Sequence, residues 1–307
     1  MARRIFVTGG SGFVGSAIVG ELTRRGHRVN ALANRRDLPT SDLVTPVRGD
    51  LLDSSTLDRG VAGCDAVIHL VGIIDERPKQ GVTFERIHVE GTRAIVEAAR
   101  RAGVGRFVHM SALGARPNAP SRYHQTKYAA EQIVTSSDLD WTILRPSMIH
   151  GPGGDFMRNA ARWARKQSPP YLFMPYFGPG LLGRGRPARL QPVYVDDVAR
   201  AFADALDNAK AVAQTYPLPG AQTLTWPEFE QTIAQAVLGK SRWVVPLPAW
   251  YARLLTYVAP RSLLPFNRDQ VLMSQEDNTA DMTPFIQDFA WTPGAFKDQI
   301  WLYAKQL

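Results

Sequence analysis

The sequence predicts an α/β protein, in which a parallel sheet with helices on both faces is joined to a smaller, mainly helical domain. Short β-rich runs alternate with longer amphipathic helical patterns throughout the first half. Residues 66–71 are nearly all apolar, as expected for a central strand that is buried on both faces. A glycine-rich turn also joins the first strand to the first helix. Together these features predict a doubly wound sheet of the Rossmann type, with right-handed crossovers.

The expected elements follow the order that such a sheet requires. Two helical patterns are the clearest, over residues 14–25 before Gly26 and over residues 84–102 before Gly103. Glycine after the last helical residue favours the left-handed conformation that ends a helix. Strands are expected over residues 4–8, 28–32, 45–49, 66–71, 106–110 and 141–144.

The pattern changes after Pro146. Residues 167–191 are rich in proline, glycine and aromatic residues and are expected to form a long loop, and residues 223–307 look mostly helical. We therefore expect two domains. The Rossmann-type domain would cover residues 1–150 and about 191–215, and the smaller substrate or partner domain would cover about 151–190 and 216–307.

Composition excludes several classes of protein. The chain has 307 residues, 45% hydrophobic and 21% charged, which is the balance of an ordinary soluble protein.

The formal charge is +8, and the basic residues are scattered along the chain without a block of five or six like charges. The chain also lacks a known nucleic-acid motif, so nucleic acid is not an expected partner. The single Cys64 excludes an internal disulfide and a cysteine zinc site, and no cluster has metal-ligand spacing. No apolar run is long enough to span a membrane, so a cytoplasmic location is expected.

The glycine-rich turn is the first candidate site. Glycine here permits a tight turn, close approach of a pyrophosphate and close helix–strand packing, and the helix N-terminus offers free N–H groups to phosphate. An ordinary flexible turn is the alternative, but the strand before it and the helix after it favour a dinucleotide site. The expected cofactor-binding residues are Thr8, Gly9, Gly10, Ser11, Gly12, Phe13, Val14 and Gly15.

The end of the second strand decides between the two nicotinamide dinucleotides. NAD-binding sheets place an acidic residue there to bind the ribose hydroxyls, whereas this chain has Asn34, Arg35 and Arg36. Guanidinium groups match a 2′-phosphate, so NADP(H) is the preferred cofactor and NAD(H) the alternative. Asp50 and Leu51, after the third strand, are placed to meet the adenine end.

A candidate catalytic group follows the fifth strand. Ser111 comes directly after it, and Tyr123 and Lys127 lie four residues apart on the next helical pattern, on one face. The ammonium of Lys127 should lower the pKa of the Tyr123 phenol and make it a general acid or base. Ser111 would position a substrate carbonyl.

These motifs make the chain resemble the short-chain dehydrogenase/reductase superfamily, in its extended and atypical branches. The resemblance is carried by residues 8–15, by Ser111, Tyr123 and Lys127, and by residues 145–147 and 192–199. Residues 67–74, 88–92, 109–115 and 121–127 resemble one atypical subgroup, related to the nucleotide-binding accessory subunit nine of the complex I alpha subcomplex.

The resemblance implies a bound NAD(P)(H), hydride transfer in active members, and a substrate cleft under the C-terminal domain. It adds Leu70, Val71, Gly72, Pro146 and Ser147 to the residues expected near the cofactor. The subgroup also implies that the nucleotide can be structural and that a respiratory complex or quinone metabolism is involved.

Two histidines are candidate substrate residues. His88 stands where extended members carry the asparagine of the proton relay, so it either keeps a hydrogen bond there or marks a site without turnover. His150 follows the sixth strand, near the expected position of the nicotinamide. By contrast, His69 and His109 lie on apolar strands and are expected to be core histidines with satisfied hydrogen bonds.

Several functions therefore stay open. The leading one is hydride transfer to or from a carbonyl or alcohol of an apolar substrate. The second is a non-catalytic NADPH-holding module docked on a membrane complex, and the third is a sugar-nucleotide epimerase or dehydratase.

An aromatic pattern over residues 250–258 and the loop 173–182 have two interpretations. They either form a surface that faces a membrane or a quinone, or they pack on the core and line the substrate cleft.

Overall fold

A computed structural model describes residues 2–34, 41–259 and 264–307. These residues form two compact units. The first comprises Met1–Pro146, Val195–Leu218 and Asp281–Trp291, and the second comprises Ser147–Tyr194, Pro219–Ala280 and Thr292–Leu307.

A seven-stranded parallel sheet forms the centre of the first unit, in the order β11-β6-β5-β4-β1-β2-β3. The chain builds β2 and β3 on one side of β1 and then continues with β4 on the other side, so the strand order reverses between β1 and β4. Ligands of open α/β sheets bind at such a switch point, outside the carboxyl ends of the strands. The strands are β1 (Arg4–Thr8), β2 (Arg28–Ala33), β3 (Val44–Arg48), β4 (Ala66–His69), β5 (Arg106–Met110), β6 (Asp140–Pro146) and β11 (Gln214–Leu218).

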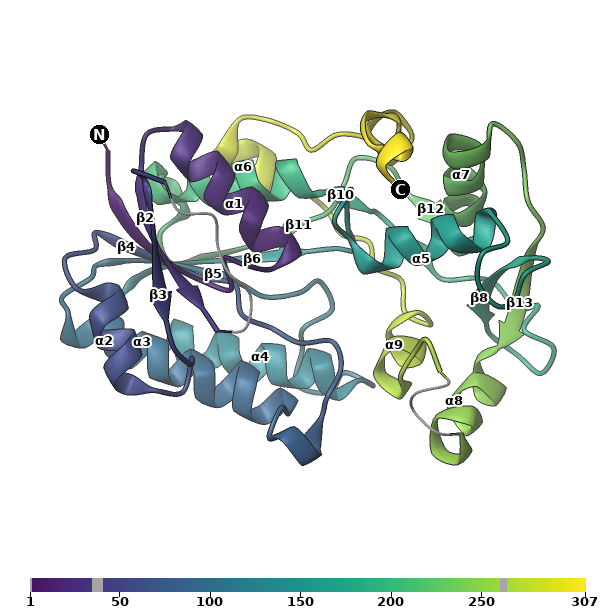
Figure 1. Ribbon diagram of the computed structural model, residues 1–307, viewed down its shortest axis with the longest axis horizontal. Coiled ribbons are helices and arrows are strands. Elements are labelled where there is room, and N and C mark those ends of the chain that lie inside the picture. The colour runs from purple at the N-terminus through teal and green to yellow at the C-terminus, as the bar shows by residue number, and fades with distance from the viewer. Residues whose placement is uncertain (1, 35–40, 260–263) are drawn as a thin grey trace. The chain divides into compact units, whose positions relative to one another are not determined.

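Helices cover both faces of this sheet, as the sequence predicts (Figure 1). One face carries α1 (Phe13–Arg24) and α6 (Val195–Asp207), which pack against each other. The other carries α2 (Ser54–Val61), α3 (Gly91–Arg101) and α4 (Arg122–Thr135), with a π-helical segment, Glu85–Glu90, leading into α3. The core under α2, α3 and α4 is apolar and includes Phe6, Leu57, Val67, Ile95, Phe107 and Ile143.

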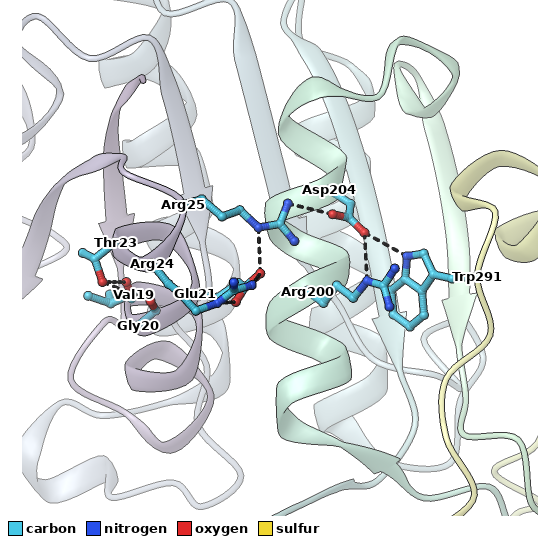
Figure 2. A network of polar contacts seen from close by, with 9 residues as sticks. All are labelled: Val19, Gly20, Glu21, Thr23, Arg24, Arg25, Arg200, Asp204 and Trp291. Carbon is cyan, nitrogen blue, oxygen red and sulfur yellow. Dashed lines mark hydrogen bonds and ion pairs between the residues drawn. The ribbon is translucent and has the colours of Figure 1, made fainter. Parts of the chain in front are cut away.

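Polar contacts connect α1 and α6 (Figure 2). Arg25 lies between Glu21, 2.6 Å away, and Asp204, 2.7 Å away. Asp204 also accepts a hydrogen bond from the indole N–H of Trp291 at 2.8 Å, and the Arg200 guanidinium lies 4.2 Å from the centre of the Trp291 ring. One carboxylate therefore connects both helices to the segment that ends at Trp291.

That segment differs from the expected domain boundary. Residues 216–307 are expected in the smaller domain, whereas the end of β11 and Asp281–Trp291, with α10 (Thr283–Phe289), belong to the first unit. Conversely, residues 147–150 and 191–194 are expected in the Rossmann-type domain but belong to the second unit. The Tyr216 hydroxyl donates to Asp288 at 2.6 Å, and the rings of Phe285 and Phe289 pack against Tyr216. An amphipathic pattern near the C-terminus does not reveal which sheet edge it covers.

The second unit is built mainly from helices with short strands. Its helices are α5 (Asp155–Ala164), α7 (Trp226–Leu238), α8 (Ala249–Val258), α9 (Arg268–Met273) and α11 (Phe296–Gln299). The short strands are β7 (Ile149–His150), β8 (Met174–Gly178), β9 (Arg189–Leu190), β10 (Val193–Tyr194), β12 (Leu224–Thr225) and β13 (Val244–Pro248).

The expectation of one long loop over residues 167–191 is wrong in part. This stretch contains β8 and β9, and β8 pairs in parallel with β13. Prolines at 175, 246 and 248 remove backbone donors from this pair, which an isolated two-stranded edge tolerates. Proline-rich strands of this kind do not show the pattern from which strands are predicted.

Candidate functional site

The turn between β1 and α1 brings the glycines into close contact with their surroundings. Gly9 has a φ of +77°, in the left-handed region that favours glycine, and a Cβ there would lie 3.2 Å from the Val71 nitrogen. A Cβ on Gly15 would lie 2.0 Å from the Gly9 carbonyl oxygen, which no side chain allows. The turn therefore packs directly on residues 70–72, which follow β4, the strand next to β1.

The first turn of α1 is open to an anion. The helix begins at Phe13 with Gly12 in extended conformation before it, and no side chain of the described residues caps it. Its first turn also contains no acidic residue. The free N–H groups and the positive end of the helix dipole are therefore available to a phosphate, as the sequence predicts for residues 8–15.

Thr8, which the sequence analysis places with the glycines, has its side chain in the core. Its hydroxyl contacts His69 Nδ1 at 2.6 Å, and His69 Nε2 contacts the Thr92 hydroxyl at 3.0 Å. Thr92 donates its own proton to the His88 carbonyl oxygen at 2.5 Å. Thr92 must therefore accept from His69, which assigns the proton of His69 to Nε2. Burial lowers the pKa of His69 to about 3, so the ring is neutral.

The expected adenine end of the site lies at the ends of β2 and β3. Asn34 donates to Asp50 at 2.8 Å, and the other oxygen of Asp50 accepts from the Leu52 backbone at 2.9 Å. Leu51 is buried, and its side chain packs where a Cβ on Gly91 would lie. Arg35 and Arg36, on which the preference for NADP(H) depends, lie outside the described residues.

Ser111, Tyr123 and Lys127 gather at the carboxyl end of β5. Lys127 is buried, and its ammonium donates at 2.5 Å to the carbonyl of Met110, the residue before Ser111. Tyr123 lies one turn before Lys127 on α4, on the same face. The Ser111 hydroxyl is buried and has no hydrogen-bond partner among the described residues. Lys127 thus lies next to the backbone that leads to Ser111, and Tyr123 lies on the same face of α4 as Lys127.

The expected effect of Lys127 on Tyr123 is wrong in direction. Burial raises the pKa of Tyr123 to about 12, and burial also lowers the pKa of Lys127 to about 8. The Lys127 ammonium donates to the Met110 carbonyl, and burial of the phenol accounts for its raised pKa. Tyr123 is therefore fully protonated at neutral pH, and Lys127 loses its proton only slightly above that.

His88 packs into the same group. Its ring lies 5.5 Å from the Tyr123 ring, measured between centres. Nε2 accepts from the Ile73 backbone N–H at 3.1 Å, so the proton of this ring is on Nδ1, which lies 2.8 Å from the Thr126 hydroxyl. Burial, followed by the Lys127 charge, lowers the pKa of His88 to about 2. His88 is therefore a neutral ring with both nitrogens hydrogen-bonded.

His109 differs from the expected satisfied core histidine. It is buried and stacks on His69 with 5.3 Å between ring centres, but neither of its nitrogens has a hydrogen-bond partner among the described residues. Burial lowers its pKa well below the usual value, and the Lys127 charge lowers it further. The register of β4 and β5 pairs His69 with His109, and this pairing is the signal that would have grouped them from the sequence.

The remaining predicted residues divide between the two units. Pro146 ends β6 in the first unit and accepts a backbone hydrogen bond from Leu113 at 2.8 Å. Ser147 belongs to the second unit, where its hydroxyl donates to the Gln191 carbonyl. His150 is buried there against Tyr303, with 2.9 Å between Nδ1 and the hydroxyl oxygen, and burial lowers its pKa to about 3.

Among residues 2–34, 41–259 and 264–307, no three His, Cys, Asp or Glu side chains are grouped so as to hold a metal ion. No helix within these same ranges combines the length and the apolar character that crossing a bilayer requires.

Comparison with known proteins identifies relatives of this arrangement. Residues 5–217 match the NAD dependent epimerase/dehydratase family. The chain is 29% identical over 245 residues to the mitochondrial NADH-ubiquinone oxidoreductase 40 kDa subunit of Neurospora crassa, covering 78% of this chain and 61% of that protein. It is 38% identical over 156 residues to the ceramide reductase of Caulobacter vibrioides, covering 48% and 47%. The chain thus spans about half to three-fifths of the length of these two relatives.

A solved structure is similar over the whole chain. The Bordetella bronchiseptica enzyme WbmH, in complex with NAD+, has a TM-score of 0.75 and is 21% identical, with 98% of both chains covered. At this identity the likeness shows the fold. It agrees with the parallel sheet of the first unit.

Proposed function

Because the chain belongs to the NAD dependent epimerase/dehydratase family, we propose that it is an NADP(H)-dependent reductase that acts on the carbonyl group of an apolar substrate. The observation that carries this proposal is the position of Lys127, whose ammonium lies 2.5 Å from the carbonyl next to Ser111 while Tyr123 lies on the same helix face.

The residues of the first unit fit a dinucleotide. The uncapped start of α1 would hold the pyrophosphate through residues 9–15, and the glycines there leave space that a Cβ would fill. Asp50 and the backbone of Leu51 would meet the adenine, and Asn34, Arg35 and Arg36 the ribose and its 2′-phosphate. Residues 70–72 would border the middle of the cofactor, and Pro146 would lie next to the nicotinamide. When bound, the cofactor supplies the hydride.

The protonation states favour reduction. Tyr123 holds its proton at neutral pH and would donate it to the substrate oxygen as the carbon accepts hydride. The unpartnered Ser111 hydroxyl would donate a hydrogen bond to that same oxygen. Lys127, with its pKa near 8, would return a proton to the tyrosinate and regain one from solvent. The name of the Caulobacter relative, a ceramide reductase, supports an apolar substrate.

A second function is favoured by His88 and by the Neurospora relative. His88 stands where extended members carry the relay asparagine, and it is a neutral ring held at both nitrogens, by the Ile73 backbone and the Thr126 hydroxyl. The Neurospora relative is named as a subunit of NADH-ubiquinone oxidoreductase. On this alternative the chain holds NADPH as a structural group and contacts a respiratory complex, with no turnover.

The test separates the two functions by nucleotide exchange. The protein is purified without added nucleotide, and the bound nucleotide is identified, quantified and exchanged against labelled NADP(H). Rapid exchange of the nucleotide supports the reductase. In that case Tyr123→Phe should leave the affinity for NADP(H) unchanged but abolish the reduction of long-chain carbonyl compounds. Tyr128→Phe, on the same helix, is the matched control and keeps activity.

Stoichiometric nucleotide that survives dialysis, with a large loss of thermal stability on its removal, supports the structural module instead. Binding of NAD(H) in strong preference to NADP(H) would contradict the assignment of Arg35 and Arg36. Failure to bind either nucleotide would overturn both functions.

A further inference from the structure

Helix α8 in the second unit exposes most of its large apolar side chains. Only Ala249 and Ala252 are buried, in a small cluster with Val271. The opposite side of the helix presents residues at i, i+1, i+4, i+7 and i+8, which form one continuous stripe. The exposed fractions are 50% for Trp250, 45% for Tyr251, 49% for Leu254, 65% for Tyr257 and 68% for Val258.

The turn after β8 continues this stripe. Leu181 is 77% exposed and Leu182 is 67% exposed. The Trp250 indole N–H donates to the Leu181 carbonyl at 2.9 Å, which fixes the turn beside the start of α8. We call these seven residues the aromatic face: Leu181, Leu182, Trp250, Tyr251, Leu254, Tyr257 and Val258.

The two sequence segments that carry the aromatic face contain no carboxylate, although Asp269 follows the second segment and Asp277 pairs with Arg186 and Arg189 of the first. Residues 156–195 contain seven Lys or Arg and no Asp or Glu, and residues 231–268 contain five Lys or Arg and again no Asp or Glu. Arg184 and Arg253 are exposed in the turn and on α8. The Arg268 guanidinium lies 5.7 Å from the centre of the Tyr257 ring, so positive charge directly borders the face.

We propose that the aromatic face binds the surface of an anionic lipid bilayer, with α8 lying in the plane of the interface. Tyrosine and tryptophan prefer the headgroup level, leucine and valine reach the acyl chains, and arginine pairs with lipid phosphate. This inference goes beyond the proposed reduction and requires no nucleotide.

The observations favour a bilayer over two other occupants. A nucleic acid would pair with the arginines but would leave Leu181, Leu182 and Val258 in water. A second copy of the chain would bring two positive surfaces together and repel. An anionic bilayer accepts both the apolar stripe and the surrounding charge.

The experiment is co-sedimentation of the full chain with vesicles of phosphatidylcholine, alone or mixed with phosphatidylglycerol. We expect binding to the anionic vesicles only, weakening as salt rises because the attraction is screened. Leu254→Ser with Val258→Ser should weaken binding about tenfold through lost apolar burial. Arg184→Gln with Arg253→Gln should weaken it about thirtyfold, from the attraction of two cations to the surface.

Trp301→Ser with Leu302→Ser is the matched control, because these side chains are 55% and 66% exposed in the same unit but belong to the segment Ile300–Leu302, which contacts α7. This variant should bind like the wild type. An equal loss in the control, equal binding to neutral vesicles, or no vesicle binding at all would overturn the proposal. A wild-type dimer that Leu254→Ser with Val258→Ser dissociates would assign the face to a second copy instead.

Discussion

The two units carry their charge differently. The first contains 22 Lys or Arg and 21 Asp or Glu, a formal charge of +1, whereas the second contains 14 and 7, a charge of +7. The first unit buries Lys127, His69, His88 and His109 close to one strand end, while the second exposes aromatic residues on α8. The two proposals divide in the same way: the proposed chemistry uses buried groups of the first unit, and the proposed binding to an anionic bilayer uses the exposed surface of the second.

The units also differ in how they bury an ionisable group. Lys127 in the first unit has the Met110 carbonyl as its acceptor. Glu230 in the second is buried on α7, and neither of its carboxyl oxygens has a hydrogen-bond partner among the described residues. A buried charge with a partner can be kept for function, whereas one without a partner is neutralised and reduces stability.

The largest expected effect is the loss of nucleotide binding in Gly15→Val. Any Cβ at Gly15 collides with the Gly9 carbonyl at 2.0 Å, so the turn must move and the pyrophosphate site is lost. We expect NADP(H) affinity to fall by more than about a hundredfold, by calorimetric titration.

Gly20→Ala is the control for this variant, because a Cβ at that position on α1 meets no atom within 4 Å. It should bind normally and raise the free energy of unfolding by roughly 0.5–1 kcal/mol. Normal binding by Gly15→Val would contradict the location of the cofactor in the first unit.

Glu230→Gln should stabilise the protein at neutral pH. Burial raises the pKa of Glu230 from 4.5 to about 8, so the unfolded chain releases a proton that the folded chain keeps. The stability contributed by the neutral carboxyl is present below pH 4.5 and is lost as pH rises towards 8. At about pH 7.5 the glutamine variant should be more stable by roughly 3 kcal/mol in urea unfolding.

The advantage of this variant should disappear near pH 4. Glu228→Gln on the same helix is the control, and its effect on stability should have the opposite sign. Hydrogen bonds from Thr225 lower the pKa of Glu228, so loss of this carboxylate should slightly destabilise the protein. An advantage of equal size at both pH values would show that Glu230 is not neutralised by burial.

Lys127→Met tests whether a buried charge that has a hydrogen-bond acceptor, unlike Glu230, still costs stability. Burial lowers the pKa of Lys127 from 10.5 to about 8, so the folded state is penalised below pH 8 and recovers as pH rises from 8 to 10.5. Methionine removes this penalty but leaves the Met110 carbonyl without its donor. We expect a net gain of about 1–2 kcal/mol near pH 7 in urea unfolding, together with loss of activity.

The exposed Lys79→Met should change stability little, which makes it the control. Destabilisation by Lys127→Met at neutral pH would mean that the hydrogen bond to Met110 outweighs the cost of burial.

The sequence predicts the first unit far better than the second. In the first unit, apolar strand patterns alternate with helical patterns that end at a glycine, as βαβ units require. The order of these elements is sufficient to place Ser111, at the end of β5, next to α4. The sequence does not predict the pairing of β8 with β13, because prolines interrupt the alternation of apolar and polar residues from which strands are recognised. The contact of Tyr216 with Asp288 joins segments 72 residues apart, which no local pattern reports.

Protonation states were the least predictable feature of the site. The spacing of Tyr123 and Lys127 correctly suggests one helix face, but the direction of the Tyr123 pKa shift depends on burial and on where the Lys127 ammonium points. His109 shows the same limit, because an apolar strand predicts that a histidine is buried but not whether its nitrogens find partners.

Asp204→Ala should give the smallest loss of stability among these variants, and it tests the contacts between α1, α6 and the segment that ends at Trp291. Asp204 accepts from Arg25, the residue after α1, and from Trp291 at the end of the returning segment, and its side chain is 24% exposed. Its removal leaves the Arg25 and Trp291 donors without this acceptor, breaks the 3.5 Å ion pair with Arg200, and should cost about 1–2 kcal/mol in urea unfolding. Asp58→Ala is the control, because it breaks one pair, with Arg101, in which both side chains are 51% exposed and solvent already screens the attraction. If both variants lose the same stability, the Asp204 contacts add no more than an exposed ion pair, and the segment after Asp281 is held to the first unit by its other contacts, such as those with Tyr216 and Asn208.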